Sequence, residues 1–264
     1  MGYQIRAGMF VLFLPVLLTA SVPPCYKKSM THHSQAALTS LVNIPVLCYH
    51  NIDTAQDKED IYHISAAHFE QQVKALHDSG YHAILPDELY DHFKKGLSLP
   101  EKTFMFTFDD THSTHFTVAA PVLEKYGFRG TFFIMTVCIG KKHYLTAQQI
   151  SALSRRGHTI GCHSYDHLPV ASLTGEQWNE QLDKPLKKLT IITGTAVWYY
   201  AYPFGTWNDQ AITALKKRGL RAAFQLSNGE STSEPMFTIR RMLVSGNWTA
   251  PMLLKKIRTS PGRP

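Results

Sequence analysis

Short apolar runs of strand type alternate with amphipathic helical stretches from residue 46 onward, and this alternation constrains the fold more than any other feature. Strands that alternate with helices form parallel sheets with the helices outside, as in a barrel or a doubly wound fold. The pattern predicts helices that include 115–126, 208–218 and 250–258, and strands at 46–49, 81–85, 103–108, 131–135, 158–162, 197–202, 222–226 and 240–244. We therefore expect one α/β domain over residues 44–260.

The residues that follow these strands are rich in acid, base and metal-ligand types. In parallel α/β folds, functional residues lie at the carboxyl ends of the strands. The positions concerned are His50, Asp109-Asp110, His163 to His167 and Pro203-Phe204-Gly205. We expect these side chains to meet at one edge of the sheet.

The chemistry of this set depends on the combination of its members. Asp109 and Asp110 alone fit a loop start or a helix cap, and two histidines four residues apart are weak evidence in a chain with 14 histidines. Together, one Asp with His163 and His167 makes a two-His-one-carboxylate set, with both histidines on one face of a helical turn. Such a set binds a divalent ion and leaves positions open for other ligands. The other Asp is then free to act as a general base.

Three segments carry a resemblance to a known family. Thr107-Phe108-Asp109-Asp110, His163-Ser164-Tyr165-Asp166-His167 and Tyr202-Pro203-Phe204-Gly205 resemble the first three motifs of the polysaccharide deacetylases of carbohydrate esterase family 4. The opening segment Pro45-Val46-Leu47-Cys48-Tyr49-His50-Asn51-Ile52 is similar to the first strand of its poly-N-acetylglucosamine-type members. The resemblance covers about residues 44–245, and the ordered pair of Asp-Asp and HxxxH motifs is specific.

The resemblance implies a distorted (β/α) barrel with about seven strands. It implies a hydrolase that removes N-acetyl groups from an N-acetylglucosamine-containing polysaccharide of the cell envelope, such as poly-N-acetylglucosamine, peptidoglycan or a chitin-like polymer. Two alternatives are open: an acetylxylan-type esterase on the same fold, and a catalytically impaired carbohydrate-binding protein. The esterase would have an identical metal site, so only product analysis separates it from the deacetylase. Metal content together with acetate release separates the binding protein from both enzymes.

The resemblance also implies a role for each motif. Asp109 is the expected general base, and Asp110, His163 and His167 are the expected ligands of a divalent metal. Zinc is the first choice, with cobalt or nickel as alternatives. Backbone N–H groups in the segment Tyr202-Pro203-Phe204 are expected to stabilise the oxyanion of the transition state.

Two departures from the family pattern concern an arginine and a histidine. Many relatives carry an Arg in the third motif, beside the catalytic Asp, and this chain has none there. Arg240 is the candidate substitute, with Arg241 beside it as the alternative. Many relatives also carry a late histidine as general acid, but no histidine follows His167. His50 is the candidate acid, and the competing interpretation is a histidine packed under the barrel mouth.

The net charge of +7 comes from 27 Lys and Arg against 20 Asp and Glu, dispersed in short pairs. No long basic block or nucleic-acid fingerprint occurs, so we expect no nucleic-acid partner and a monomer that acts on an acetylated polysaccharide. A basic surface suits work beside an anionic envelope, although it is equally a solvated surface without meaning.

The N-terminal region has the layout of an export signal. Arg6 precedes an apolar run at residues 9–18 and small residues at 19–21, so 1–25 is the expected signal peptide and 26–43 a linker. The expected location is secreted, periplasmic or envelope-associated. Lipid attachment at Cys25 is a minority reading, because two prolines precede it. Cys48, Cys138 and Cys162 are expected to be buried apolar side chains.

Overall fold

The structure is a computed structural model that describes residues 1–2, 44–53, 59–226 and 229–259. Nearly all of the expected signal peptide (1–25) and linker (26–43), with Cys25, lies outside these residues. The division into signal, linker and domain therefore stays a prediction. The expected catalytic domain is the part that the structure describes.

Strands and helices alternate along the chain as the sequence pattern predicts. The strands are β1 (Val46–Tyr49), β2 (Asn51–Asp53), β3 (His63–Ser65), β4 (His82–Ala83), β5 (Thr103–Phe108), β6 (Thr131–Ile134), β7 (Thr159–Cys162), β8 (Tyr199–Ala201), β9 (Ala222–Gln225), β10 (Ile239–Arg240) and β11 (Met242–Leu243). The α-helices are α2 (Ala66–Asp78), α3 (Pro86–Lys95), α4 (Ala120–Lys125), α5 (Ala147–Arg155), α6 (Lys184–Thr193), α7 (Asp209–Lys217) and α8 (Ala250–Arg258).

The main sheet is parallel and nearly closes into a barrel. Its strand order is β10-β9-β8-β7-β6-β5-β1-β11, and β4 pairs with β5 outside this path. The two ends of the order, β10 and β11, belong to one segment, residues 239–243. Since β10 pairs with β9 and β11 pairs with β1, this closing segment joins the two edges of the sheet. If the closing segment is counted as one strand, the barrel has seven strands along this order, which confirms the expected distorted barrel.

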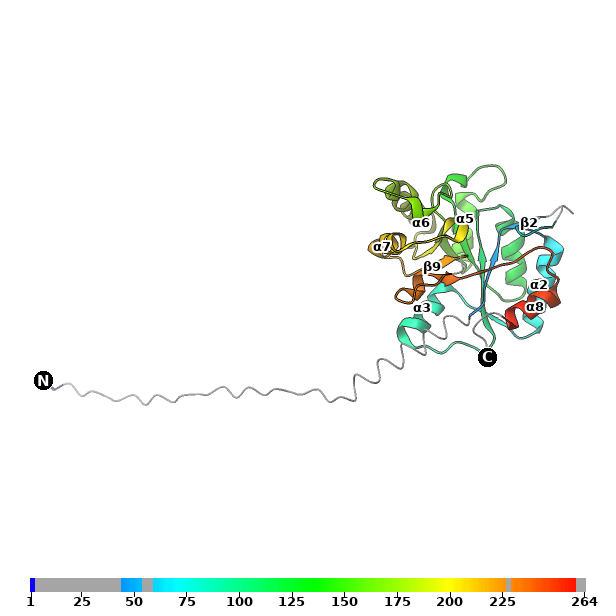
Figure 1. Ribbon diagram of the computed structural model, residues 1–264, viewed down its shortest axis with the longest axis horizontal. Helices are drawn as coiled ribbons and strands as arrows, with labels where there is room; N and C mark the ends of the chain where they lie inside the picture. The colour runs from blue at the N-terminus through cyan, green and yellow to red at the C-terminus, as the bar shows by residue number, and fades with distance from the viewer. Residues whose placement is uncertain (3–43, 54–58, 227–228, 260–264) are drawn as a thin grey trace.

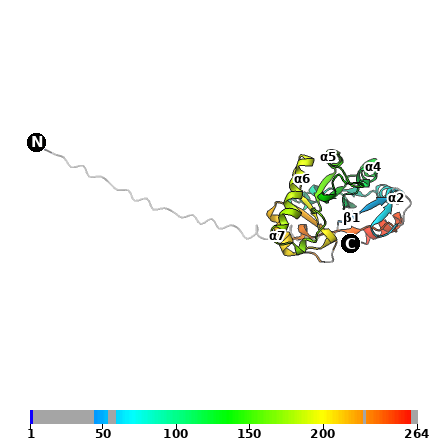
Figure 2. The ribbon, with the colours of Figure 1, turned by 90° about the horizontal axis from the view of Figure 1, so that it is seen from above.

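The helices lie outside the strands (Figures 1 and 2). All residues of β1 and β5 are buried, as expected for parallel strands covered on both faces. Stacked rings fill the space beside β5, where Phe108 packs between Tyr49 and Phe132 with ring centroids 5.6 Å and 4.8 Å away. This packing fixes the ends of β1 and β5 next to each other.

Two helices begin with a wide turn for the same reason. The π-helical turns His115–Ala119 and Asn179–Asp183 run directly into α4 and α6. Each of these α-helices carries a proline at its second position, Pro121 or Pro185. A proline has no N–H to donate and its ring collides with the carbonyl of the preceding turn, so the helix widens there.

Other differences from the predicted elements are small. The expected strand 81–85 shortens to β4, and a two-stranded parallel pair, β2 with β3, was not predicted. The expected strand 240–244 is divided at Arg241, because its two halves pair with different strands. Cys48, Cys138 and Cys162 are buried and free, as expected. Within the described ranges, no helix has the length and apolar character that crossing a membrane requires.

Candidate active site

The register of β1 and β5 places the first site residues side by side. Tyr49 pairs with Phe108, so the next residues, His50 and Asp109, leave neighbouring strands at the same level. The Asp109 N–H donates to the carbonyl of Tyr49 at 3.0 Å, which continues the ladder by one bond. The sequence therefore brings these two side chains together through strand pairing alone.

Asp110, His163 and His167 form a compact donor set. The Oδ1 atom of Asp110 lies 3.5 Å from Nε2 of His163 and 3.7 Å from Nε2 of His167. One donor atom from each residue lies within 4.8 Å of the others. This is the spacing that the expected metal ligands need, and the three residues come together as the sequence predicts.

The histidine pair does not lie on a helical turn, and that expectation is wrong. Residues 163–167 form an irregular loop in which Ser164 and His167 have positive φ, 66° and 72°. The loop is held by the Ser164 hydroxyl, which accepts the His167 N–H at 2.9 Å. Asp110 also has positive φ, 72°. Such a conformation costs energy in non-glycine residues and is typical of functional sites, where the surroundings enforce it.

The donor set fits a divalent cation. Asp110 Oδ1 is buried and has no hydrogen-bond partner among the described residues. His163 Nδ1 donates to the carbonyl of Ala201 at 2.8 Å, which leaves Nε2 unprotonated in the neutral ring and aimed at Asp110. Burial lowers the pKa of His163, but the charges of Asp109 and Asp110 outweigh it and raise that pKa above 6.5. The site therefore calls for positive charge, which a bound cation supplies.

Asp109 is held by an arginine. Arg241 binds it bidentately, Nη1 to Oδ1 and Nη2 to Oδ2, both at 2.7 Å. Both side chains are at most 1% exposed. Burial opposes ionisation of Asp109 most strongly, yet the charges of Arg241 and His163 outweigh it and hold its pKa below the usual 3.8. Asp109 is therefore a carboxylate at neutral pH, 3.8 Å from His163 Nε2.

His50 faces the same space from β1. Its Nδ1 is buried without a hydrogen-bond partner in the described chain, and its ring meets Tyr62 edge-on at 5.3 Å. Its backbone carbonyl accepts a hydrogen bond from His115 Nε2 at 2.7 Å, which fixes the main chain. Burial lowers the pKa of His50, and the charges of Asp109 and Asp110 oppose this shift.

The third motif lies on the other side of the donor set. Tyr202 is buried, its N–H donates to Phe224 and its hydroxyl donates to the carbonyl of Phe237. The Tyr202 N–H is used in strand pairing and Pro203 has no N–H. The first backbone N–H of this motif that can serve another acceptor is therefore that of Phe204. The Phe204 ring is 62% exposed and meets His167 at 4.4 Å between centroids.

A cavity of about 480 Å³ unites these groups. Its lining contains most of the expected site residues and several that the sequence did not indicate. The lining residues are His50, Asn51, Tyr62, His63, Asp109, Asp110, His163, His167, Tyr202, Phe204, Leu226 and Leu243. The cavity lies at the carboxyl ends of the strands, where parallel barrels place their active sites.

Of the two candidate arginines, the one at the site is Arg241, whereas Arg240 is exposed and does not line the cavity. The prediction that Arg240 replaces the family's third-motif arginine is therefore wrong, and Arg241 takes that place beside Asp109. Alternation along the strand could have indicated this, because Ile239 is buried and a residue two positions on lies on the same face. His63 begins β3 and Tyr62 directly precedes it, and neither residue lies in any of the segments that carry the family resemblance.

Comparisons with known proteins agree with this geometry. The polysaccharide deacetylase family profile matches residues 96–223. YxkH of Bacillus subtilis (strain 168), a protein named only by class as a polysaccharide deacetylase, is 30% identical over 76% of this chain and 71% of its own length. The structure of IcaB from Ammonifex degensii is similar with a TM-score of 0.70, 26% identity, and coverage of 82% of this chain and 97% of that one.

A further solved structure supports the fold alone. The Streptococcus pyogenes deacetylase PplD, in complex with acetate, has a TM-score of 0.73 at 22% identity, covering 81% of this chain and 97% of that chain. Fold and site together define a barrel hydrolase in which a buried carboxylate lies beside a cation-type donor set. The chain belongs to the polysaccharide deacetylase family, and it is an enzyme of the polysaccharide deacetylase class.

Proposed function

We propose that this chain is a zinc-dependent N-deacetylase of an N-acetylglucosamine-containing polysaccharide of the cell envelope. The observation that carries the proposal is the placement of the Arg241-held Asp109 carboxylate beside the donor set Asp110, His163 and His167. A base that is kept ionised next to a cation site is the pairing that amide hydrolysis needs.

Asp110, His163 and His167 would hold the metal. When bound, a divalent cation polarises a carbonyl and makes water a better nucleophile. The nitrogen and oxygen donors suit zinc, while cobalt and nickel accept the same ligands. The hydrogen bond from His163 to Ala201 orients its ring for this role before any cation arrives.

Asp109 is the proposed general base. Its carboxylate accepts the proton of the attacking water, and the bidentate contact with Arg241 keeps it ionised and oriented. The Phe204 N–H is the proposed donor to the oxyanion, because it lies in the motif next to His167 and is not consumed by the sheet.

His50 is the proposed general acid. The leaving nitrogen must gain a proton, since an amide anion is too basic to depart. His50 lines the same cavity as the donor set, and its Nδ1 has no partner in the described part of the chain. The other route is that Asp109 returns the proton which it has taken up.

The substrate is proposed from relatives and from the rim of the cavity. A protein of Staphylococcus aureus (strain MSSA476) named poly-beta-1,6-N-acetyl-D-glucosamine N-deacetylase is 28% identical over 70% of this chain and 68% of its own length. Exposed aromatic rings of Tyr62 and Phe204 stand on the rim, 47% and 62% exposed. Such rings stack on the apolar faces of sugars, so they suit a polymer that passes over the cavity.

The test is acetate release from a panel of acetylated glycans by protein that carries one equivalent of zinc. The panel contains β-1,6-linked and β-1,4-linked N-acetylglucosamine oligomers, peptidoglycan fragments and acetylated xylan. We expect release from an N-acetylglucosamine polymer, with a loss of about 10²-fold in Asp109→Asn, which keeps its metal. Release from acetylated xylan alone would show an esterase. No release from any glycan would contradict the proposal.

Export is part of the proposal, because the substrate lies outside the cytoplasm. The support is the layout of residues 1–25, a basic start, a short apolar run and small residues after it. N-terminal sequencing of the mature protein tests this. Retention of Met1 on a cytosolic protein would contradict export, and a blocked, lipid-bearing Cys25 would favour anchoring.

A further inference from the structure

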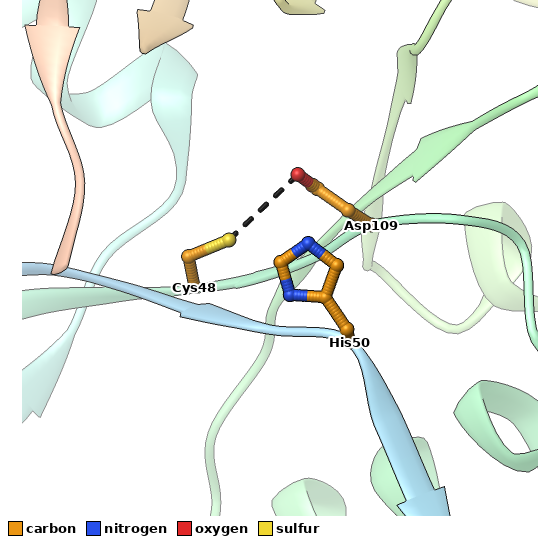
Figure 3. Close-up of side chains that lie close together, drawn as sticks. All are labelled: Cys48, His50 and Asp109. Atoms are coloured by element: carbon orange, nitrogen blue, oxygen red, sulfur yellow. Dashed lines mark hydrogen bonds between the residues drawn. The ribbon is translucent and has the colours of Figure 1, made fainter. Parts of the chain in front are cut away.

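A second group of potential ligands lies directly beside the first. Cys48, His50 and Asp109 each offer one donor atom, and these atoms lie within 4.8 Å of one another. They come from the ends of β1 and β5, and Figure 3 shows the His50 ring beside the contact between the other two side chains. This group shares no residue with the set Asp110, His163 and His167.

We propose that Cys48, His50 and Asp109 form a second cation site, at which excess Zn²⁺ or another thiophilic divalent ion binds and inhibits the enzyme. The binding itself follows from the donor geometry. The inhibition rests on the proposed function, because it depends on the roles of Asp109 as base and His50 as acid.

Two of the three donors are available for a ligand. Cys48 Sγ is completely buried and lies 3.7 Å from Asp109 Oδ2, a weak hydrogen bond. His50 contributes one ring nitrogen, and Figure 3 shows Nε2 turned toward the contact between the other two side chains. The lone pair of a neutral imidazole nitrogen binds a cation directly.

The lone pair of Asp109 that faces the cysteine accepts only the weak S–H bond from Cys48, and it becomes free for a cation when the thiol loses its proton. Arg241 occupies one direction of each carboxylate oxygen, through Oδ1 and Oδ2, at 2.7 Å. Each oxygen of an ionised carboxylate accepts two bonds, so Oδ2 can keep Arg241 and still bind a cation. The cation reaches the group through the cavity, because His50 and Asp109 line it, while Cys48 lies behind them.

The donor types make the proposed site selective. Thiolate and imidazole favour zinc, cobalt or cadmium over magnesium or calcium, which prefer oxygen. Burial raises the pKa of the Cys48 thiol well above its usual value, so the empty site holds S–H. A cation that binds sulfur displaces this proton to the solvent, which magnesium does not achieve.

The second site should bind more weakly than the first. The Arg241 guanidinium stands against Asp109, and a cation on Asp110 would stand on its other side. Both positive charges repel a second cation, so the site fills only when metal is in excess. A cation bound there occupies the lone pairs of both Asp109 and His50, which removes the proposed base and the proposed acid together.

The test uses cobalt, which reports a sulfur ligand through a charge-transfer absorption in the near ultraviolet. Full-length protein carrying one equivalent of Co²⁺ receives a second. We expect the band to grow with the second equivalent in the wild type and in the matched control Cys138→Ser, which changes another buried free cysteine. Cys48→Ser should keep the first equivalent and show no band.

Activity is measured in a separate arm. Excess Zn²⁺ should inhibit the wild type, and Cys48→Ser should need about tenfold more zinc for the same fractional inhibition, each protein being compared with its own rate at one equivalent. If the protein with one equivalent of zinc releases no acetate, the proposed function is contradicted. The cobalt measurement still tests the second site, because it does not depend on activity. If Cys48→Ser fails to fold, His50→Gln replaces it, with a weakened band expected. A wild type without the band at two equivalents, or a band that persists in Cys48→Ser, would overturn the site.

Discussion

Removal of the Arg241 charge should destabilise the fold and impair the base at the same time. In Arg241→Met, Asp109 remains in a position that is 1% exposed, with no guanidinium to offset its charge. Loss of one partner of a buried ion pair costs about 3–5 kcal/mol, because the other charge stays out of water. For a domain of this size, each kcal/mol lowers the melting temperature by roughly 2–4 °C, so we expect a decrease of about 6–20 °C.

The assay is thermal and urea unfolding of the metal-free protein, with Arg240→Met as the matched control. Arg240 precedes Arg241 in the same closing segment but is exposed, so its loss should cost less than about 1 kcal/mol. Arg241→Met combined with Asp109→Asn should be more stable than the sum of the two single changes predicts, because neither charge is left alone. Equal stability of the two arginine variants would refute the buried pair. Turnover of Arg241→Met should fall about 10–100-fold.

Three more changes test separate parts of the site. His163→Ala should lose near-stoichiometric metal in elemental analysis, and full retention would remove it from the ligand set. His50→Ala should lose the alkaline limb of its pH–rate profile and about 10²-fold in turnover with metal retained, because an acid acts only while protonated; an unchanged profile would make it a packing residue. His115 is buried with its pKa lowered from 6.5 to about 3, mainly by burial, so its contribution to stability is fully present above pH 6.5, falls steadily below that pH, and is gone once the pH has fallen through 3. When the pH is lowered from 7.5 to 5, only the 1.5 pH units below 6.5 count, and at about 1.36 kcal/mol each they remove about 2 kcal/mol of unfolding free energy. In urea unfolding, the loss of stability over this pH range should be smaller by that amount in His115→Gln than in the wild type.

Local patterns predicted the strands and most of the site because these depend on neighbouring residues. The run Thr103–Phe108 is short, apolar and rich in aromatic residues, which favours a buried strand and places Asp109 and Asp110 at its end. The meeting of these carboxylates with His163 and His167 follows from the general rule that parallel strands end at the same edge of the sheet.

Contacts between distant segments were beyond reach of the same patterns. The bond between Arg241 and Asp109 joins residues 132 positions apart. Alternation from Ile239 indicates which arginine faces inward, but it does not give the carboxylate that this arginine meets. The HxxxH spacing favoured a helical turn, yet positive φ at Ser164 and His167 produces the same convergence from an irregular loop. Backbone strain of this kind is enforced by tertiary contacts and leaves no mark in the residue pattern.

The closing segment 239–243 also links the base to the closure of the barrel. The three proposed ligands, Asp110, His163 and His167, all precede this segment in the chain, whereas the arginine that holds Asp109 belongs to it. The segment that joins the two edges of the sheet therefore also carries the charge that keeps the proposed base ionised. Integrity of the barrel and ionisation of Asp109 depend on the same five residues.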